Sequence, residues 1–218
     1  MRIVFDIDGV VADFVSGMNA LAGQLTGKQP LYPAPCRNWL TEAGGLTEAE
    51  DEAVWKAVGE SADFWANLPH LPHTHQFVAH MNRWASQGHD IVFVTNRSLG
   101  KDVRRQTDLW LKEAGVLPPR TALIVNGPKG ELLKALGADV FVDDYPGNIV
   151  DACAVSPNTK SLLLAHPYNQ GEMQGALRLA PELVLLAIEA MTQGGGDELP
   201  ELPVLQQIQD PTAVIRAE

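Results

Sequence analysis

Five short apolar runs, each about the length of a strand, are spread along this 218-residue chain and alternate with helix-like segments. The runs are "RIVFDI" (2–7), "DIVFVTN" (90–96), "TALIVN" (121–126), "ADVFVDD" (138–144) and "KSLLLAH" (160–166). The segments with helical patterns are 74–88, 99–115, 129–137 and 146–155. Strands that are apolar almost throughout are typical of a parallel sheet covered on both faces. The alternation therefore predicts an α/β fold with a parallel sheet flanked by helices.

The stretch between the first two runs, residues 14–70, breaks this alternation. It is rich in Trp, Pro and Gly and holds one acidic helical segment, in which Thr47 and Glu50 have the spacing of a capping box. We expect a small, mostly helical insertion here, carried by a core of residues 1–13 and 71–193. Residues 194–218 are expected to be a linker and a C-terminal tail.

Polar side chains follow the predicted strands at the points where the apolar runs stop. They are Asp6 and Asp8, then Thr95, Asn96 and Arg97, then Asn126 with Lys129 beyond it, and last Asp143 and Asp144. Because ligands bind beyond the carboxyl ends of the strands in an open parallel sheet, these groups are expected to share one edge.

Four carboxylates at one edge would repel one another unless a cation lies among them. Oxygen ligands of this kind suit Mg²⁺, which takes one or two carboxylates together with waters and a substrate phosphate. Asp6 and Asp8 point the same way from an extended backbone, so that one can attack phosphorus while the other reaches the leaving oxygen. Gly9 then permits a tight turn or a close approach to phosphate.

Structural interpretations exist for each of these residues taken singly. A calcium loop beginning at Asp6 is excluded, because its later ligand positions would fall on Val10 and Gly17. The pair at 143–144 could cap a helix, Thr95 could lie in a turn, and Lys129 could be a solvated helix start. Their occurrence together at successive strand ends favours catalysis.

The overall charge and the cysteines narrow the setting. A formal net charge of −11 disfavours extended nucleic acid as a partner. No run approaches the length that spans a membrane, and we expect neither a signal peptide nor a membrane partner. Cys36 and Cys153 have no metal-type spacing and are expected to be packing residues in a reducing, cytoplasmic setting.

These motifs resemble those of the haloacid dehalogenase (HAD) superfamily of phosphotransferases. "FDIDGVVADF" corresponds to its first motif, "VFVTNR" to the second and "PKGELLKALGADVFVDD" to the third and fourth. Over about residues 1–170 the chain most resembles the 5′(3′)-deoxyribonucleotidase family of cytosolic type C, through "DGVVADF", "DFWANLPHLP" and "LLLAHPYN". The resemblance implies a Rossmann-like core with a small helical cap inserted after the first motif.

The resemblance also implies roles. Asp6 would be the nucleophile that forms an aspartyl-phosphate, and Asp8 would be the acid and then the base. Thr95 and Lys129 would hold the phosphoryl oxygens. Mg²⁺ would be bound by the Asp6 carboxylate, the Asp8 backbone carbonyl and Asp143, with Asp144 close by.

The cap of this family supplies aromatic side chains that stack on the base, and Phe14, Trp39 and Trp55 correspond to such positions, although packing inside the cap is the alternative for each. Asn96 is a further candidate for substrate contact. The sequence "TNR" departs from the Thr-Ser-Pro type of second motif, and Arg97 either contacts substrate or pairs with a carboxylate.

Two further clusters have ordinary explanations beside functional ones. The histidines of "PHLPHTH" (69–75) form either a metal site or a loop with a helix cap, and no carboxylate or cysteine stands at matching spacing. The basic run "KDVRR" (101–105) either touches a phosphate backbone or is a solvated helix face.

The combined prediction is a Mg²⁺-dependent phosphomonoesterase, a 5′-nucleotidase acting on (deoxy)nucleoside monophosphates. A phosphatase for nucleic-acid 3′-phosphate ends is an alternative, favoured if 101–105 and Arg97 form one basic path to the cleft. Small phosphosugars are another substrate class, and a catalytically silent binding module is the alternative outside enzymes. The expected partner is the small phosphomonoester substrate, and a homodimer is a further hypothesis.

Overall fold

The computed structural model describes residues 1–28, 45–119, 121–170 and 176–194. Its sheet has six strands, all parallel, in the order β3-β2-β1-β4-β5-β6. The strands are β1 (Arg2–Phe5), β2 (Asp90–Thr95), β3 (Thr121–Ile124), β4 (Val140–Asp143), β5 (Lys160–Leu164) and β6 (Leu177–Leu179). The predicted parallel α/β sheet is confirmed, and β6 adds a strand for which the sequence analysis made no assignment.

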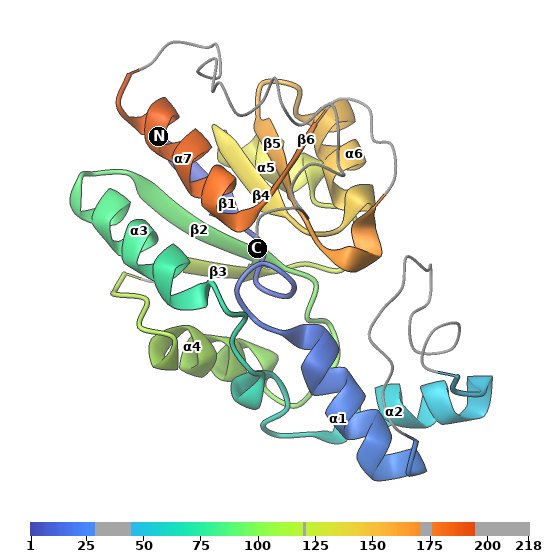
Figure 1. Ribbon diagram of the computed structural model, residues 1–218. Coiled ribbons are helices and arrows are strands. Elements are labelled where there is room, and N and C mark those ends of the chain that lie inside the picture. The colour runs from blue at the N-terminus through green and yellow to red at the C-terminus, as the bar shows by residue number, and fades with distance from the viewer. Residues whose placement is uncertain (29–44, 120, 171–175, 195–218) are drawn as a thin grey trace, which may run out of the picture.

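Helices cover both faces of this sheet (Figure 1). One face carries α3 (Thr74–Ser86), α4 (Val103–Glu113) and α7 (Pro181–Thr192), while the other carries α5 (Gly130–Leu136) and α6 (Pro146–Val155). Side chains of β1 alternate between the two: Ile3 and Phe5 pack with Phe77 of α3, and Val4 packs with Ile149 of α6. Burial on both faces explains why the strands are apolar throughout.

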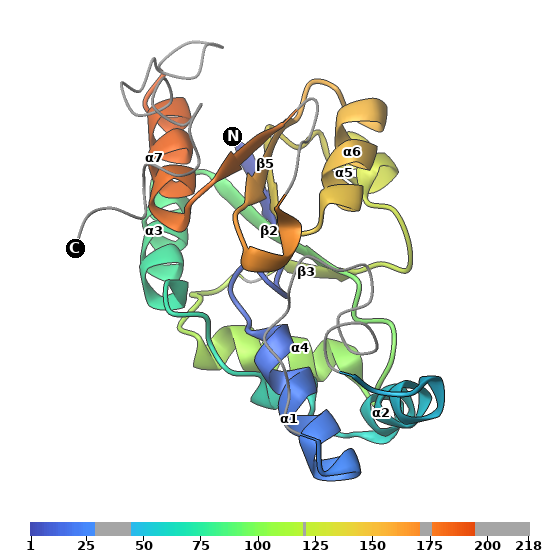
Figure 2. The same cartoon turned by 45° about the vertical axis from the view of Figure 1, so that its right-hand side comes forward.

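The described parts of the segment after the first strand are helical, as predicted. It contains α1 (Phe14–Thr26), α2 (Glu48–Glu60) and the short 3₁₀-helix η2 (Trp65–Asn67). The capping box of Thr47 and Glu50 is present at the start of α2. In both views α1 and α2 lie beyond the end of the sheet at which β1 finishes (Figures 1 and 2).

The division into a core, a cap (14–70) and a tail (194–218) stays a prediction. Residues 29–44, which include Cys36 and Trp39, and nearly all of the tail lie outside the described residues. No helix in the described ranges combines the length and the apolar character that a membrane crossing requires.

Strand register brings the predicted polar groups to one edge. Phe5 of β1 pairs with Phe93 of β2 and with Val142 of β4. Asp6 therefore leaves the sheet level with Asp143, close to the end of β2 at Thr95. The predicted meeting of the first, second and fourth strand ends is confirmed.

Candidate active site

A buried ammonium group lies between two carboxylates at this edge. Lys129 Nζ is 2.9 Å from Asp6 Oδ1 and 2.7 Å from Asp143 Oδ2, and the lysine side chain is completely buried. Burial disfavours the charged form of Lys129, but the carboxylates of Asp143 and Asp6 outweigh it and raise the lysine pKa above its usual value. Lys129 is thus a fixed positive charge beneath the carboxylates.

Helix α5 begins directly after this lysine, and α6 holds that start in place. The backbone N–H of Gly130 donates a 2.6 Å hydrogen bond to Asp151 Oδ2 of α6. A Cβ at Gly130 would lie 2.8 Å from the Asp151 carboxylate and from Val155. The close contact of α5 with α6 therefore fixes the direction from which Lys129 reaches the site.

The two aspartates after β4 are held by different partners. Asp143 Oδ2 accepts a 2.9 Å hydrogen bond from Asn148 Nδ2, and its Oδ1 accepts a 2.8 Å bond from the backbone N–H of Tyr145. Asp144 Oδ2 accepts a 2.5 Å bond from the Tyr168 hydroxyl, and Asn169 Nδ2 donates to the Asp144 backbone carbonyl at 2.7 Å.

Asn148, Tyr168 and Asn169 were not among the predicted site residues. Tyr168 and Asn169 belong to "HPYN" after β5, so their position beyond a fifth strand end was the signal that could have found them. Asn148 lies in the first turns of α6 and has no comparable signal in the sequence.

The carboxyl groups carry more negative charge than their protein neighbours compensate. Burial raises the pKa of Asp6 well above its usual range. The negative charges of Asp143, Asp8 and Asp144 raise it further, while the positive charge of Lys129 lowers it. Burial and then the charge of Asp143 raise the pKa of Asp144 to about 7, although the Tyr168 hydrogen bond opposes this.

This excess charge fits a divalent cation. Asp6, Asp143 and Asp144 each offer one carboxylate oxygen, and these oxygens lie within 4.8 Å of one another. Asp6 Oδ1 is buried, and its ion pair with Lys129 at 2.9 Å leaves this oxygen with a lone pair that a cation could use. Hard oxygen donors with a net negative charge suit Mg²⁺. The role of the Asp8 backbone carbonyl as a ligand stays a prediction.

The raised pKa of Asp144 predicts how pH affects the metal-free protein. The folded chain keeps a proton that the unfolded chain releases near pH 4, so ionising Asp144 in the fold lowers the free energy of unfolding as pH rises from about 4 to about 7. Asp144→Asn removes this loss. Its melting temperature should therefore exceed that of the wild type by several degrees at pH 8 and by little at pH 5.

The measurement is thermal unfolding with a chelator present, over pH 5 to 8. The difference in melting temperature between variant and wild type is compared, because it cancels the titration of the groups that both proteins share. A difference independent of pH would contradict the prediction. Added Mg²⁺ should remove the advantage of Asp144→Asn, since the cation compensates the carboxylate.

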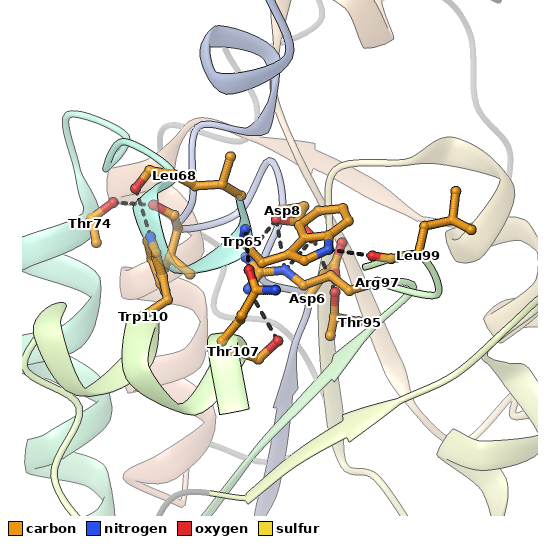
Figure 3. Close-up of polar contacts among 12 residues, drawn as sticks. Asp6, Asp8, Trp65, Leu68, Thr74, Thr95, Arg97, Leu99, Thr107 and Trp110 are labelled. Carbon is orange, nitrogen blue, oxygen red and sulfur yellow. Dashed lines mark hydrogen bonds and ion pairs between the residues drawn. The ribbon is translucent and has the colours of Figure 1, made fainter. Parts of the chain in front are cut away.

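Asp8 has a different environment from the other three aspartates. Arg97 donates to its carboxylate through Nε at 2.9 Å and through Nη2 at 2.8 Å, and Thr95 Oγ1 donates at 3.1 Å (Figure 3). Of the two alternatives for Arg97, the structure shows the pairing with a carboxylate. Thr95 is likewise placed against Asp8.

Gly9 allows the loop to pass beside Asp144. Its φ is +76°, and a Cβ there would lie 2.2 Å from Asp144 Oδ2. The loop is also held from both sides, because His73 Nε2 lies 2.9 Å from the Val10 carbonyl oxygen and His166 Nε2 lies 2.6 Å from that of Gly9. A glycine is therefore required at position 9 by both conformation and space.

An aromatic cavity opens beside the catalytic candidates. It has a volume of about 420 Å³ and is lined by Asp6, Asp8, Phe14, Trp55, Trp65, Asn96, Ser98 and Leu99. Phe14 and Trp65 are stacked, with ring centroids 5.7 Å apart and planes at 8°. Phe14, Trp55 and Asn96 thus lie where a substrate could contact them. Trp65, Ser98 and Leu99 were not predicted, and Trp39 lies outside the described residues.

A second cavity of about 440 Å³ extends from the same carboxylates toward the loops after β4 and β5. Asp6, Asp8, Phe14 and Asn96 line both cavities, whereas Asp144 and Tyr145 line the second cavity and not the first. Asp6 and Asp8 therefore face open space on two sides.

The histidines of 69–75 and the basic run 101–105 have structural contacts rather than the arrangement of a binding site. His73 is bonded to the loop backbone, and His70 packs edge-on against Trp110. Among the described residues, the one acidic or histidine cluster arranged for a metal is Asp6, Asp143 and Asp144. In the basic run, Arg105 is exposed and pairs with Asp102.

The strand order and the helices on both faces define a Rossmann-like α/β fold, and solved structures that include a HAD-superfamily hydrolase share this fold. A hydrolase from Pseudomonas syringae is 16% identical with a TM-score of 0.52, covering 88% of this chain and 99% of its own. A HAD-superfamily hydrolase of subfamily IA from Geobacter sulfurreducens is 14% identical with a TM-score of 0.51, covering 85% and 95%. A protein described as a predicted phosphoglycolate phosphatase from Haemophilus somnus is 14% identical with a TM-score of 0.51, covering 88% and 97%. At such identities the likeness concerns the fold alone.

The family follows from the sequence match. The model of the family described as 5′ nucleotidase, deoxy (pyrimidine), cytosolic type C matches residues 1–181, and the chain belongs to this family. No curated protein matches the chain in sequence. The resemblance drawn from the motifs is thereby confirmed, and the chain stands among the HAD-type phosphatases.

Proposed function

We propose that the protein is a Mg²⁺-dependent 5′-nucleotidase that dephosphorylates (deoxy)nucleoside monophosphates through an aspartyl-phosphate on Asp6. The observation that carries the proposal is the joint lining of one cavity by Asp6, Asp8 and aromatic rings. Family membership supports the same substrate class. A phosphate placed on Asp6 would leave the nucleoside facing Phe14, Trp55 and Trp65.

The proposed reaction has two steps. A carboxylate oxygen of Asp6 attacks phosphorus, the bond from phosphorus to the nucleoside oxygen breaks, and Asp8 gives that oxygen a proton. Asp8 then takes a proton from water as the water oxygen attacks phosphorus, which releases phosphate and restores Asp6. Covalent capture divides one slow hydrolysis into two easier steps.

The other residues supply charge and orientation. Thr95 and Lys129 are proposed to hold the phosphoryl oxygens once substrate is present. Asp6, Asp143 and Asp144 would hold Mg²⁺, which supplies charge neutralisation of the phosphoryl group. Pre-positioned charge is the main source of catalysis in phosphoryl transfer.

The alternative substrates are less well supported. A basic path to the cleft would favour 3′-phosphorylated nucleic acid, but Arg97 is buried against Asp8 and Arg105 is paired with Asp102. Small phosphosugars would leave the aromatic cavity without a partner. A cytoplasmic location and a homodimer stay predictions.

The test is phosphate release from a panel, measured with Mg²⁺ and with a chelator. The panel holds nucleoside 5′- and 3′-monophosphates, glucose 6-phosphate and a 3′-phosphorylated oligonucleotide. We expect at least one nucleotide to exceed the other classes in kcat/KM by about tenfold, which is within the discrimination that one binding cavity supplies. Release from no nucleotide would refute the substrate class.

Trp55→Ala is the matched variant for this panel. It removes one ring of the cavity without touching the carboxylates, so KM for nucleotides should rise several-fold while turnover of glucose 6-phosphate stays unchanged. An equal loss on both substrates would argue against a nucleoside in this cavity.

A further inference from the structure

The strongest unexplained feature of the molecule is a completely buried arginine beside the catalytic candidates. Arg97 has 0% exposure, whereas Asp8, which it contacts, keeps 18% of its side chain exposed. Two guanidinium nitrogens bind the one carboxylate: Nε lies 2.9 Å from Oδ2 and 3.2 Å from Oδ1, and Nη2 lies 2.8 Å from Oδ1. Contacts through two nitrogens fix the plane of a carboxylate as well as its position.

The arginine is itself fixed by two tryptophans and a threonine, of which Trp65 also lines the aromatic cavity. Its Cζ lies 5.1 Å from the ring centre of Trp65 and 5.9 Å from that of Trp110, and its Nη1 is 3.3 Å from Thr107 Oγ1 (Figure 3). Trp110 Nε1 is anchored to the Leu68 carbonyl at 2.8 Å. A guanidinium between aromatic rings is well suited to a buried charge.

This geometry leaves Arg97 no face toward substrate. Arg97 lines neither of the two cavities at Asp6 and Asp8. Asn96, the residue before Arg97, lines both cavities. Of the groups that line the cavities, Arg97 contacts the Asp8 carboxylate and the Trp65 ring, and it forms hydrogen bonds only with Asp8, so an effect on proton transfer passes through that carboxylate.

We infer that Arg97 is a positioning residue, which fixes the carboxylate of Asp8 in the orientation that proton transfer requires. The inference rests on the proposed function, since it concerns the acid and base of that reaction. Asp8 lies in a loop beyond the end of β1, so the sheet does not hold its side chain. Arg97 and Thr95, from the end of β2, provide the missing support.

The inference separates Arg97 from a substrate-binding arginine. A group that positions the acid and base changes kcat and leaves KM nearly constant, whereas a group that binds phosphate changes both. A positioning arginine also affects the rate only while Asp8 can transfer protons. In a chain that carries Asp8→Asn, removal of Arg97 should then have little further effect.

The experiment is a double-mutant cycle with wild type, Arg97→Met, Asp8→Asn and the double variant. Single-turnover kinetics at high enzyme concentration give rates for the slow variants, with the best nucleotide of the panel as substrate. Arg97→Met should lower the rate about 10- to 100-fold, as expected for a misplaced catalytic group, with KM changed less than about threefold. In the Asp8→Asn background the same substitution should change the rate less than about threefold.

An additive cycle, in which Arg97→Met lowers the rate equally in both backgrounds, would overturn the inference. So would a loss that lies mainly in KM. Arg97→Lys should recover part of the rate, because one ammonium keeps the charge without the two-point contact. Arg105→Met, at an exposed position of α4, is the control and should match the wild type.

Arg97→Met leaves a gap beside two tryptophans, so thermal unfolding of each variant is recorded. Thr107→Val serves if Arg97→Met does not fold, since it removes one anchor of the guanidinium and keeps the arginine. Its rate loss, expected to be about two- to fivefold, should also vanish in the Asp8→Asn background, and persistence of the loss there would overturn the inference.

Failure of the proposed function gives a different result. A wild type that hydrolyses 4-nitrophenyl phosphate but no nucleotide refutes the substrate class, and the cycle is then run on that ester. A wild type inactive on every phosphomonoester refutes the proposed chemistry and the inference with it. An active wild type with an additive cycle refutes only the inference.

Discussion

Asp6→Asn is expected to abolish phosphate release and to leave the fold intact. The amide cannot form the bond to phosphorus that the carboxylate forms, and Asn places the same number of heavy atoms at the end of β1. We expect kcat to fall by at least about a thousandfold, as for other enzymes that lose a covalent nucleophile. The measurement is phosphate release with Mg²⁺ at saturating nucleotide.

The stability of this variant is a second observable. Burial raises the pKa of Asp6, which means that the fold favours the uncharged form of this side chain over the charged form. An uncharged amide should therefore leave the melting temperature at pH 8 unchanged or higher in the absence of Mg²⁺. Asp63→Asn, an exposed aspartate, is the control and should keep full activity. Turnover within tenfold of wild type in Asp6→Asn would rule out the aspartyl-phosphate.

The sheet and the positions of the main acidic residues follow from local sequence. A parallel strand buried on both faces has to be apolar, so a polar residue such as Asp6 or Asp143 marks the point where the strand leaves the core. The carboxyl ends of parallel strands meet at one edge, and this alone brings Asp6, Thr95 and Asp143 together. The shared position of these three residues can therefore be predicted from the order of the strands along the chain alone.

The partners of each side chain depend on geometry that one sequence does not contain. Arg97 could face substrate or a carboxylate, and the choice is made by Trp65 and Trp110, which come from separate elements. Tyr168 reaches Asp144 only because the turn after β5 runs beside the loop after β4. Such contacts arise from tertiary packing, for which spacing along the chain carries no signal.

Two elements near the C-terminal end were missed for a related reason. β6 has three residues and lies at the sheet edge, so its apolar pattern is too short to recognise. α7 is apolar on most sides, with Val184, Leu185 and Ile188 all buried, which obscures the helical period.

Lys129→Met is expected to damage activity and stability together, because one ammonium group neutralises two carboxylates. Its Nζ lies 2.9 Å from Asp6 and 2.7 Å from Asp143, in a place where water does not reach. Removing one partner of a buried ion pair costs about 3–5 kcal/mol, since the remaining charges lose their compensation. The loss of one phosphoryl contact should also lower kcat about 100- to 1000-fold.

The pH dependence distinguishes this electrostatic cause from a simple packing defect. The pKa values of Asp6 and Asp144 are already raised, and removing Lys129 raises them further, so these carboxyl groups take up protons as pH falls from 8 to 5.5. Protonation relieves the repulsion that the variant suffers. The difference in melting temperature between wild type and Lys129→Met should therefore shrink toward low pH, and Mg²⁺ should shrink it at pH 8.

The control is Lys134→Met, which removes an exposed lysine from the same helix and changes net charge equally. It should match the wild type in melting temperature and in kcat, because solvent screens its charge. A stability loss in Lys129→Met that is the same at pH 5.5 and pH 8, with and without Mg²⁺, would mean that Lys129 acts through packing. The carboxylates would then not depend on it for compensation, and the charge balance argued for this site would fail.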